Sequence, residues 1–204
     1  PIYEITLHPR DNDMLIATHG RSLWILDDLA PFQKYGEALA SSAHPFAVPV
    51  GVQRNAAGDR MRDFEGDRRF FGENPDPGTV LTYRLASAAK EVAIHLRDAS
   101  GTLVREMKGD DLKDKNKAGM HQVAWDLRRE PLPKVKGQES EGRFGPGESG
   151  PFVLPGTYQA RLLVDGSEAS SSSLEVQGDP DIDITDADRG TYLETAGKVY
   201  DLNR

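Results

Sequence analysis

The segment Val92-Ala-Ile-His-Leu-Arg97 decides the fold, because every second residue in it is large and apolar. This period of two is typical of a β-strand that buries one face and exposes the other. The same alternation returns at Val123-Ala-Trp-Asp-Leu127 and at Tyr158-Gln-Ala-Arg-Leu162. Such strands occur in antiparallel sheets that pack face to face. The pattern therefore predicts a β-sandwich over residues 78–178, with the indole of Trp125 buried between its sheets.

Turn residues separate the strands of this predicted sandwich. Asp98-Ala-Ser-Gly101 is expected to form a hairpin turn, with Gly101 at the position that most needs a positive φ. Pro155-Gly156 and Asp165-Gly166 separate later strands. The strands themselves are predicted at 79–85, 91–97, 102–107, 120–127, 157–165 and 171–176.

Residues 1–29 form a different predicted unit, an antiparallel meander with strands at 3–7, 14–18 and 22–26. Asp11-Asn-Asp13 and Gly20 supply its turns. The second and third strands are apolar on both faces, which predicts that they are covered on two sides. A meander of this size cannot supply that cover alone, so it must pack on the rest of the chain or on neighbouring segments.

Two further segments complete the predicted organisation. Residues 30–77 are rich in Pro and Gly, which predicts a linker between domains with one short helix at 33–41. Its expected anchors are aromatic: Phe64, Phe70 and Phe71. Residues 179–204 are expected to begin a helical segment, because Thr185-Asp-Ala-Asp188 resembles a capping box and apolar residues then recur at helical spacing.

The overall composition argues against several classes of partner. A formal net charge of −8 disfavours binding to nucleic acid or to an anionic membrane, because phosphate contacts need clustered Lys and Arg. The chain has no Cys, which excludes disulfides and thiolate chemistry. No apolar run approaches the ~20 residues that a spanning helix needs. We therefore expect neither nucleic acid nor a membrane as partner.

A family resemblance adds to these patterns. Leu7-His-Pro-Arg-Asp-Asn-Asp-Met-Leu-Ile-Ala-Thr-His-Gly-Arg-Ser-Leu-Trp-Ile-Leu-Asp-Asp28 resembles the last blade of secreted bacterial proteins with BNR-type, sortilin-like β-propellers. The resemblance continues through Arg69-Phe-Phe-Gly-Glu-Asn-Pro-Asp-Pro-Gly78 and Thr79-Val-Leu-Thr-Tyr83. Ala118-Gly-Met-His-Gln-Val-Ala-Trp-Asp-Leu-Arg128 and Pro155-Gly-Thr-Tyr158 are similar to the Ig-like domain of flagellar hook-capping proteins. That domain also follows the propeller in the BNR-type family.

The resemblance implies a mainly β fold with three parts: a propeller-blade-type antiparallel meander, an immunoglobulin- or fibronectin-III-like β-sandwich, and a short C-terminal helix. It also implies an exported, multi-domain protein that works outside the cell or in the periplasm. The chain starts at Pro1 inside a strand pattern, so we expect it to be a piece of a longer polypeptide with its export signal upstream. The parent would be glycosyl-hydrolase-like. No catalytic residue carries over, because the Asp-box pattern Ser-x-Asp-x-Gly-x-x-Trp does not occur.

The best candidates for a binding surface are His19, Arg21 and Trp24. At a blade edge, the cation and the indole are able to stack on a sugar or a peptide. The alternative is structural, with Trp24 filling the space between blades while Gly20 and Arg21 make the turn. No catalytic, cofactor-binding or metal-binding residue is predicted.

Three other clusters are weaker candidates. His8 and His19 are expected near matching ends of the first hairpin, which would suit a metal pair or simple turn histidines. The acidic run 179–188 has Ile184 and Gly190 at the sixth and twelfth positions, which does not fit an EF-hand and favours a solvated turn. A third set lies in a Gly-rich loop unsuited to paired carboxylate catalysis: Glu139, Glu141 and Glu148.

These expectations lead to one main functional hypothesis and one alternative. In the first, the chain is a non-catalytic structural or interaction module that braces the rest of its own propeller by apolar packing. In the alternative, it is the carbohydrate- or peptide-binding accessory region of a BNR-type glycoside hydrolase. A hydrolase within the chain itself would need a convergent acid and base. We also expect that apolar strands without a cover make the isolated chain prone to form a homo-oligomer.

Overall fold

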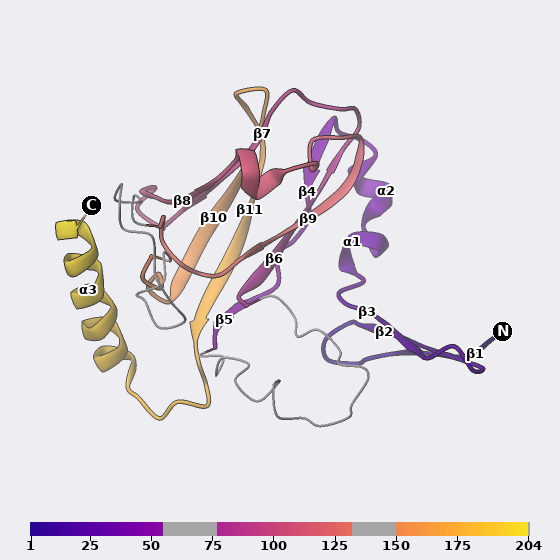
Figure 1. Cartoon of the computed structure of the whole chain (residues 1–204), viewed down its shortest axis with the longest axis horizontal. Coiled ribbons are helices and arrows are strands. Elements are labelled where there is room, and N and C mark those ends of the chain that lie inside the picture. The colour runs from indigo at the N-terminus through magenta and orange to yellow at the C-terminus, as the bar shows by residue number, and fades with distance from the viewer. Residues whose placement is uncertain (55–76, 132–149, 204) are drawn as a thin grey trace, which may run out of the picture.

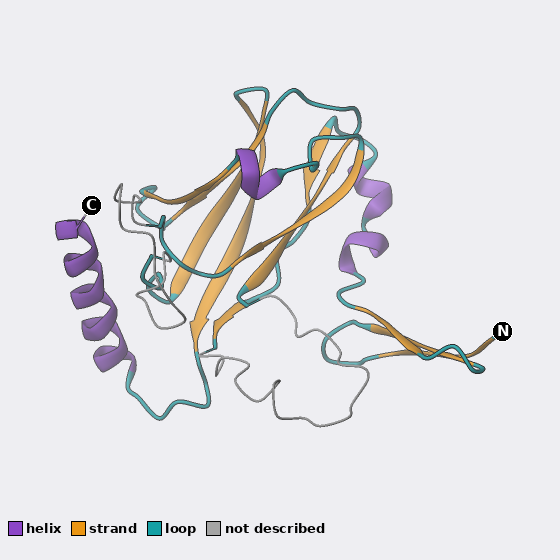
Figure 2. Ribbon diagram, viewed as in Figure 1, coloured by secondary structure: helices purple, strands orange, loops and turns teal. Residues whose placement is uncertain are grey.

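The computed structural model describes residues 1–54, 77–131 and 150–203 (Figure 1). These residues are mainly β and end in one long helix (Figure 2). Hydrogen bonding joins the described strands into three separate sheets. Two of these sheets share a hydrophobic core, and the third stands apart from it.

The larger of the two core sheets has the strand order β5-β11-β10-β7-β8. Its neighbours are antiparallel, except that β5 runs parallel to β11. The strands are β5 (Gly51–Gln53), β7 (Val92–Arg97), β8 (Leu103–Met107), β10 (Gly156–Val164) and β11 (Ser167–Gly178). The smaller sheet, in the order β4-β6-β9, is antiparallel throughout. It contains β4 (Ala43–Pro45), β6 (Thr79–Leu85) and β9 (Gly119–Trp125).

The core lies between these two sheets, because each turns its apolar residues toward the same buried cluster. Strand β7 alternates between buried and half-buried residues along its whole length, as its sequence predicts. Trp125 is only 1% exposed, and its ring meets that of Tyr158 edge to face at 5.7 Å between centroids. The predicted burial of the indole is confirmed.

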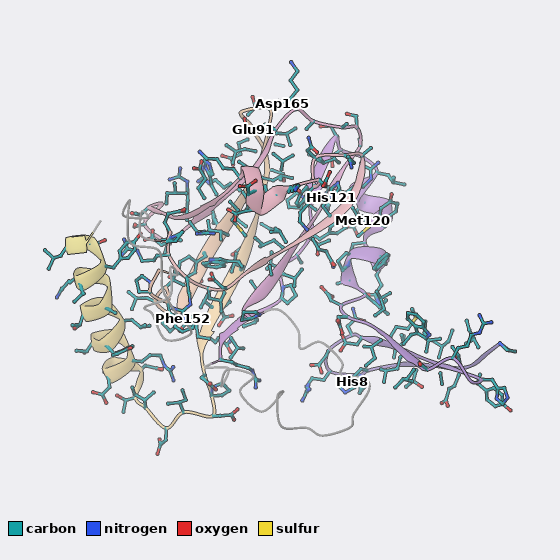
Figure 3. The ribbon with its side chains drawn as sticks, in the orientation of Figure 1. His8, Glu91, Met120, His121, Phe152 and Asp165 are labelled. Carbon is teal, nitrogen blue, oxygen red and sulfur yellow. The ribbon has the colours of Figure 1, made fainter. Side chains whose placement is uncertain are left out.

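Side chains close the turns between the core strands. Gly101 has φ +86°, and the carboxylate of Asp98 accepts hydrogen bonds from the N–H groups of Ser100 and Thr102, each at 2.9 Å. The turn between β10 and β11 carries a second carboxylate. Asp165 accepts from the N–H of Glu91 at 3.0 Å and so ties this turn to the start of β7 (Figure 3).

The structure differs from the expected linker in the described part of residues 30–77. Two short helices, α1 (Ala30–Gln33) and α2 (Tyr35–Ala38), replace the single predicted helix, and β4 and β5 each add an edge strand to a core sheet. Each of these strands has three residues, which is too short to show a period in the sequence. The predicted anchors Phe64, Phe70 and Phe71 lie outside the described residues.

The N-terminal meander forms the third sheet, in the order β1-β2-β3. Its strands are β1 (Ile2–Leu7), β2 (Met14–Thr18) and β3 (Leu23–Leu26), close to the predicted segments. It projects away from the two core sheets (Figure 1). Most of its large apolar side chains are exposed, so within the described residues nothing covers it.

Helix α3 (Asp186–Asn203) confirms the predicted C-terminal helix. Its first turn is capped by Thr185, whose hydroxyl accepts a hydrogen bond from the N–H of Asp188 at 3.1 Å and donates one to the Asp188 carboxylate at 2.7 Å. Leu193 and Tyr200 are its buried apolar residues. They mark the side of the helix that faces the rest of the protein.

Candidate interaction surface

The turn between β2 and β3 holds the predicted site residues together. Gly20 and Ser22 both have positive φ values, +76° and +69°, which let the chain reverse tightly. The indole N–H of Trp24 donates to the carbonyl oxygen of Arg21 at 3.0 Å. This bond fixes the ring beside the turn while leaving Trp24 62% exposed. The indole therefore presents its surface to solvent.

The strand register places Trp24 in a continuous apolar face. Ile5 pairs with Ile16, and Ile16 pairs with Trp24, so these side chains form a row across all three strands. A second row on the same face, two residues further along, is also apolar: Leu7, Met14 and Leu26. We call these six residues the Trp24 face.

The opposite face of the meander is apolar on two of its three strands. Leu15 pairs with Ile25, and Ala17 pairs with Leu23. Only β1 contributes polar side chains there, from Glu4 and Thr6. Because both faces expose apolar side chains, this sheet has the surface of an inner layer without its neighbours.

His19 lies at the same end of the sheet, where it contacts the start of β1. Its backbone N–H donates to the carbonyl oxygen of Pro1 at 3.2 Å, and its ring stacks on Tyr3 at 5.8 Å between centroids. The imidazole, the exposed Arg21 and the Trp24 indole thus gather at one end of the meander, from segments on either side of the turn. These are the three residues named from the sequence as candidates for a binding surface, and their role in binding stays a prediction.

The expected meeting of His8 and His19 is wrong. The N–H of His8 donates to the carbonyl oxygen of Asp13 at 2.8 Å, at the β1–β2 turn, where Figure 3 labels it. The antiparallel register pairs the other end of β1 with Thr18, next to His19. The two imidazoles therefore lie at opposite ends of the hairpin. In the part of the chain that the structure describes, no group of three or more His, Asp or Glu side chains is placed to bind a metal ion.

The acidic run before α3 behaves as a turn and a helix cap. The carboxylate of Asp179 accepts from the N–H of Asp181 at 3.0 Å, and Asp188 belongs to the cap of α3. Asp179 is buried, at 8% exposed, so only the later carboxylates of the run, which are exposed, fit the favoured interpretation of a solvated turn. The other carboxylates considered from the sequence, Glu139, Glu141 and Glu148, lie outside the described residues.

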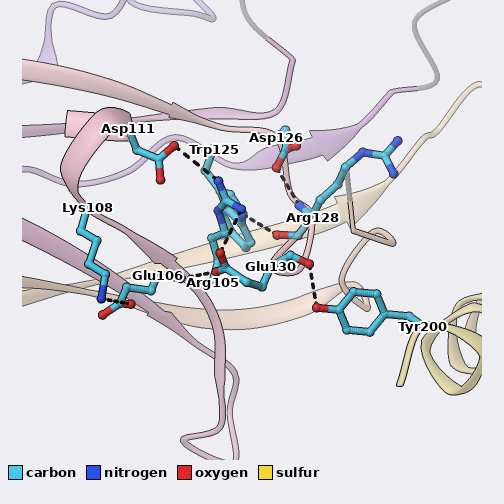
Figure 4. A network of polar contacts seen from close by, with 9 residues as sticks. All are labelled: Arg105, Glu106, Lys108, Asp111, Trp125, Asp126, Arg128, Glu130 and Tyr200. Carbon is cyan, nitrogen blue, oxygen red and sulfur yellow. Dashed lines mark hydrogen bonds and ion pairs between the residues drawn. The ribbon is translucent and has the colours of Figure 1, made fainter. Parts of the chain in front are cut away.

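A second polar cluster, which sequence reasoning missed, surrounds Glu130 beside β8 (Figure 4). Glu130 lies 3.6 Å from the Arg105 guanidinium and accepts a hydrogen bond from the phenol of Tyr200 through its backbone carbonyl at 2.7 Å. Nearby, His95 lies 3.0 Å and Lys108 2.7 Å from the carboxylate of Glu106. The bond from Lys108, followed by that from His95, holds the pKa of Glu106 below its usual range.

Two buried tyrosines anchor the core sheets to neighbouring loops. The hydroxyl of Tyr158 donates to the carbonyl oxygen of Leu154 at 2.6 Å, and that of Tyr83 donates to the carbonyl oxygen of Lys115 at 2.7 Å. Burial disfavours the phenolate and raises the pKa of each hydroxyl to about 12. Both groups are therefore neutral donors at physiological pH.

The comparisons with known proteins give no family for this chain. No family model, curated protein or solved structure matches it. Within the described residues, no helix combines the length and the apolar composition that crossing a bilayer requires.

Proposed function

We propose that this chain is a non-catalytic structural module that braces an exported BNR-type, sortilin-like β-propeller by apolar packing. In this proposal, the meander β1-β2-β3 belongs to a propeller blade and the two core sheets form an Ig- or fibronectin-III-like domain that follows it. The observation that carries the proposal is the meander itself, whose two faces both expose apolar side chains, with Glu4 and Thr6 of β1 as the polar exceptions on one face. Blades of a propeller pack face to face around a central channel, so each blade has a neighbour on both faces.

The amount of apolar surface suits a bracing role. Burying a large apolar side chain contributes about 1.5–3 kcal/mol relative to leaving it exposed. Ile5, Ile16 and Trp24 in one row of the Trp24 face would thus contribute several kcal/mol together if a neighbouring blade covered them. That is enough to fix the orientation of one domain on another.

The order of the core strands supports the Ig- or fibronectin-III-like assignment. In such domains, strands A, B and E form one sheet and strands C, F and G form the other. The orders β4-β6-β9 and β11-β10-β7-β8 correspond to these sheets, with β8 as an additional edge strand after C and β5 as a further edge strand, parallel to β11, beyond G. The absence of Cys agrees with the fibronectin type rather than with the disulfide-linked antibody type.

A side-chain contact gives independent support. Ig-type sandwiches carry a tyrosine corner, in which a Tyr near the start of strand F bonds to a backbone group a few residues upstream. Tyr158 lies near the start of β10, the proposed strand F, and its hydroxyl bonds to Leu154, four residues upstream. The chain departs from antibody domains in one respect, because its buried Trp125 lies on β9 rather than on strand C.

The experiment that tests the proposal compares amide exchange in two polypeptides from the same gene. One is the chain described here, and the other adds the sequence encoded upstream of Pro1. We expect exchange in β2 and β3 to slow by about a hundredfold or more in the longer polypeptide, because covered strands open only with the domain. Strand β10 is the internal control and should not change. Upstream sequence without repeated four-stranded blades, or unchanged exchange in β2, would refute the proposal.

The exposed indole favours one alternative, a carbohydrate- or peptide-binding accessory region. Trp24 and Arg21 are the residues that would stack on such a ligand. Calorimetric titration of the isolated chain with glycans and peptides would detect it. Binding that the Trp24→Ala variant loses would favour this alternative, whereas no binding by the unaltered chain would leave the bracing role as the better account.

A further inference from the structure

Strand β8 is an edge strand, and among the described residues Glu130 bonds to its outer side. Among the described strands it pairs only with β7. An edge strand presents unpaired N–H and C=O groups that attract another strand. Here the N–H of Glu130 donates to the carbonyl oxygen of Val104 at 3.0 Å, and the Glu130 carboxylate accepts from the N–H of Glu106 at 3.0 Å. Glu130 therefore satisfies two outward groups of β8.

This geometry copies one residue of a parallel strand. In a parallel ladder, a residue opposite position i donates to the C=O of i−1 and accepts from the N–H of i+1 through its own C=O. Relative to Arg105, Glu130 does both, but its side-chain carboxylate replaces its backbone carbonyl as the acceptor. The other carboxylate oxygen lies 3.6 Å from the Arg105 guanidinium. The edge thus accepts strand-like backbone pairing together with a negative charge opposite Arg105.

Helix α3 holds the displaced carbonyl of Glu130. The phenol of Tyr200, which is 4% exposed, donates to that carbonyl oxygen at 2.7 Å (Figure 4). The Arg129 guanidinium stacks over the Tyr200 ring at 4.6 Å and pairs with Asp201 at 3.0 Å. These contacts fix the backbone at residues 129 and 130, so that Glu130 stays against β8.

We propose that the outer edge of β8 is a strand-addition site for an extended peptide with an acidic residue opposite Arg105, and that α3 controls access to it through Tyr200. In this structure Glu130 occupies the site. Undocking of α3 would release the Glu130 carbonyl and let an incoming strand take the place of this residue. The inference does not depend on the propeller, because every contact that carries it lies in the core sheets, residues 129–130 and α3.

The chemistry of the edge favours such a peptide over a second copy of β8. An antiparallel pair related by a two-fold axis normal to the sheet, centred on Arg105, would place Arg105 opposite its own copy. Like charges directly opposite each other destabilise a strand pair. An acidic residue at that position instead reproduces the contact that Glu130 makes with Arg105, whose guanidinium also lies 3.7 Å from the carboxylate of Asp111.

The first test measures exchange of the Glu106 amide by NMR in the whole chain. Tyr200→Phe keeps the ring and its stacking but removes the hydroxyl that holds Glu130. We expect the Glu106 amide to exchange about two- to tenfold faster, as the loss of one hydrogen bond predicts. Tyr192→Phe, at a residue that is 70% exposed on the same helix, is the matched control and should not change exchange. Equal exchange in Tyr200→Phe and the unaltered chain would overturn the control by α3.

The second test measures peptide binding by fluorescence anisotropy. The probe is a labelled Thr-Val-Glu-Val-Thr peptide, and its control is Thr-Val-Lys-Val-Thr. Glu130→Ala opens the edge, so we expect this variant to bind the acidic probe at least about tenfold more tightly than the unaltered chain does. We also expect the variant to bind the acidic probe at least about tenfold more tightly than it binds the Lys peptide. Near-UV circular dichroism verifies folding, and Glu130→Gln replaces the Ala variant if that signal is lost. Equal affinity of the variant and the unaltered chain for the acidic probe, including no binding by either, would overturn the proposed site.

Discussion

The buried indole of Trp125 is the residue on which the core depends most. It is packed edge to face against Tyr158 and donates its N–H to the carbonyl oxygen of Arg128 at 3.0 Å. Trp125→Ala should lower the free energy of unfolding by about 3–5 kcal/mol, because it leaves a cavity and an unpaired carbonyl. Urea unfolding measures this change. Trp24→Ala at the exposed indole is the control and should change stability by less than about 1 kcal/mol.

The buried tyrosines predict a loss of stability at alkaline pH. Their pKa values of about 12 in the folded chain exceed the ordinary value of 10.0, so the folded state keeps protons that the unfolded state loses. Their contribution to stability should therefore be constant below about pH 10 and fall as the pH rises toward 12, by about 3 kcal/mol for each group. Tyr158→Phe should remove about half of this pH dependence in denaturant titrations. An unchanged pH profile in that variant would contradict the assignment to Tyr158.

At the scale of the element, the start of α3 depends on its cap. Thr185→Ala removes the hydroxyl that accepts from the N–H of Asp188 and should destabilise the helix by about 1 kcal/mol. Thr191→Ala is a matched control inside the same helix, where Ala has the higher helix propensity and the expected change is a small gain. Circular dichroism at 222 nm during thermal unfolding follows both variants. Equal effects of the two substitutions would show that the cap contributes nothing specific.

Element length explains how much of the fold the sequence predicts. Strand β6 matches its predicted bounds, and β7 and β10 lie within one residue of theirs, because each is long enough to show two or more repeats of the period. Strands β4 and β5 were missed because partners far along the chain stabilise them: β6 for the first and β11 for the second. The turn at Gly101 is predictable from the sequence because a positive φ, +86° in the structure, depends on the local chain and is a conformation that Gly adopts readily.

The same distinction explains the candidate sites. The predicted surface at Arg21 and Trp24 lies within one hairpin, so the local sequence places its members together. In the other cluster, Glu130 is hydrogen-bonded to Val104 of β8 and to Tyr200 of α3. Nothing local in the sequence pairs a carboxylate with a strand edge so far away. The prediction for His8 and His19 is wrong because β2 separates them. His8 lies at the turn before β2 and His19 at the turn after it, so the two residues are at opposite ends of the strand.

For the whole molecule, the two core sheets should fold without the meander. The meander is hydrogen-bonded to the rest of the chain where it ends, for example by the N–H of Leu29, which donates to the carbonyl oxygen of Asn12 at 3.0 Å. A chain that starts at Leu29 should therefore unfold within about 3 °C of the unaltered chain, since its core is intact. It should also bind less of the dye ANS, because the Trp24 face is removed. A fall in Tm of ten degrees or more would show that the meander belongs to the core.

The parallel pair of β5 and β11 gives the molecule a direction of mechanical resistance. Gly51 aligns with Val176 and Gln53 aligns with Gly178, so the chain enters this pair at one end and leaves toward α3 at the other. Tension applied between residue 51, where the chain enters the pair, and residue 178, where it leaves, pulls the two strands in opposite directions along their axes. All the hydrogen bonds between the strands then bear the load together. In an antiparallel pair, the start of the first strand and the end of the second lie at the same end, so tension between them would break the hydrogen bonds one after another. Force applied between residues 51 and 178 should therefore meet greater resistance than force that peels one strand away from the other.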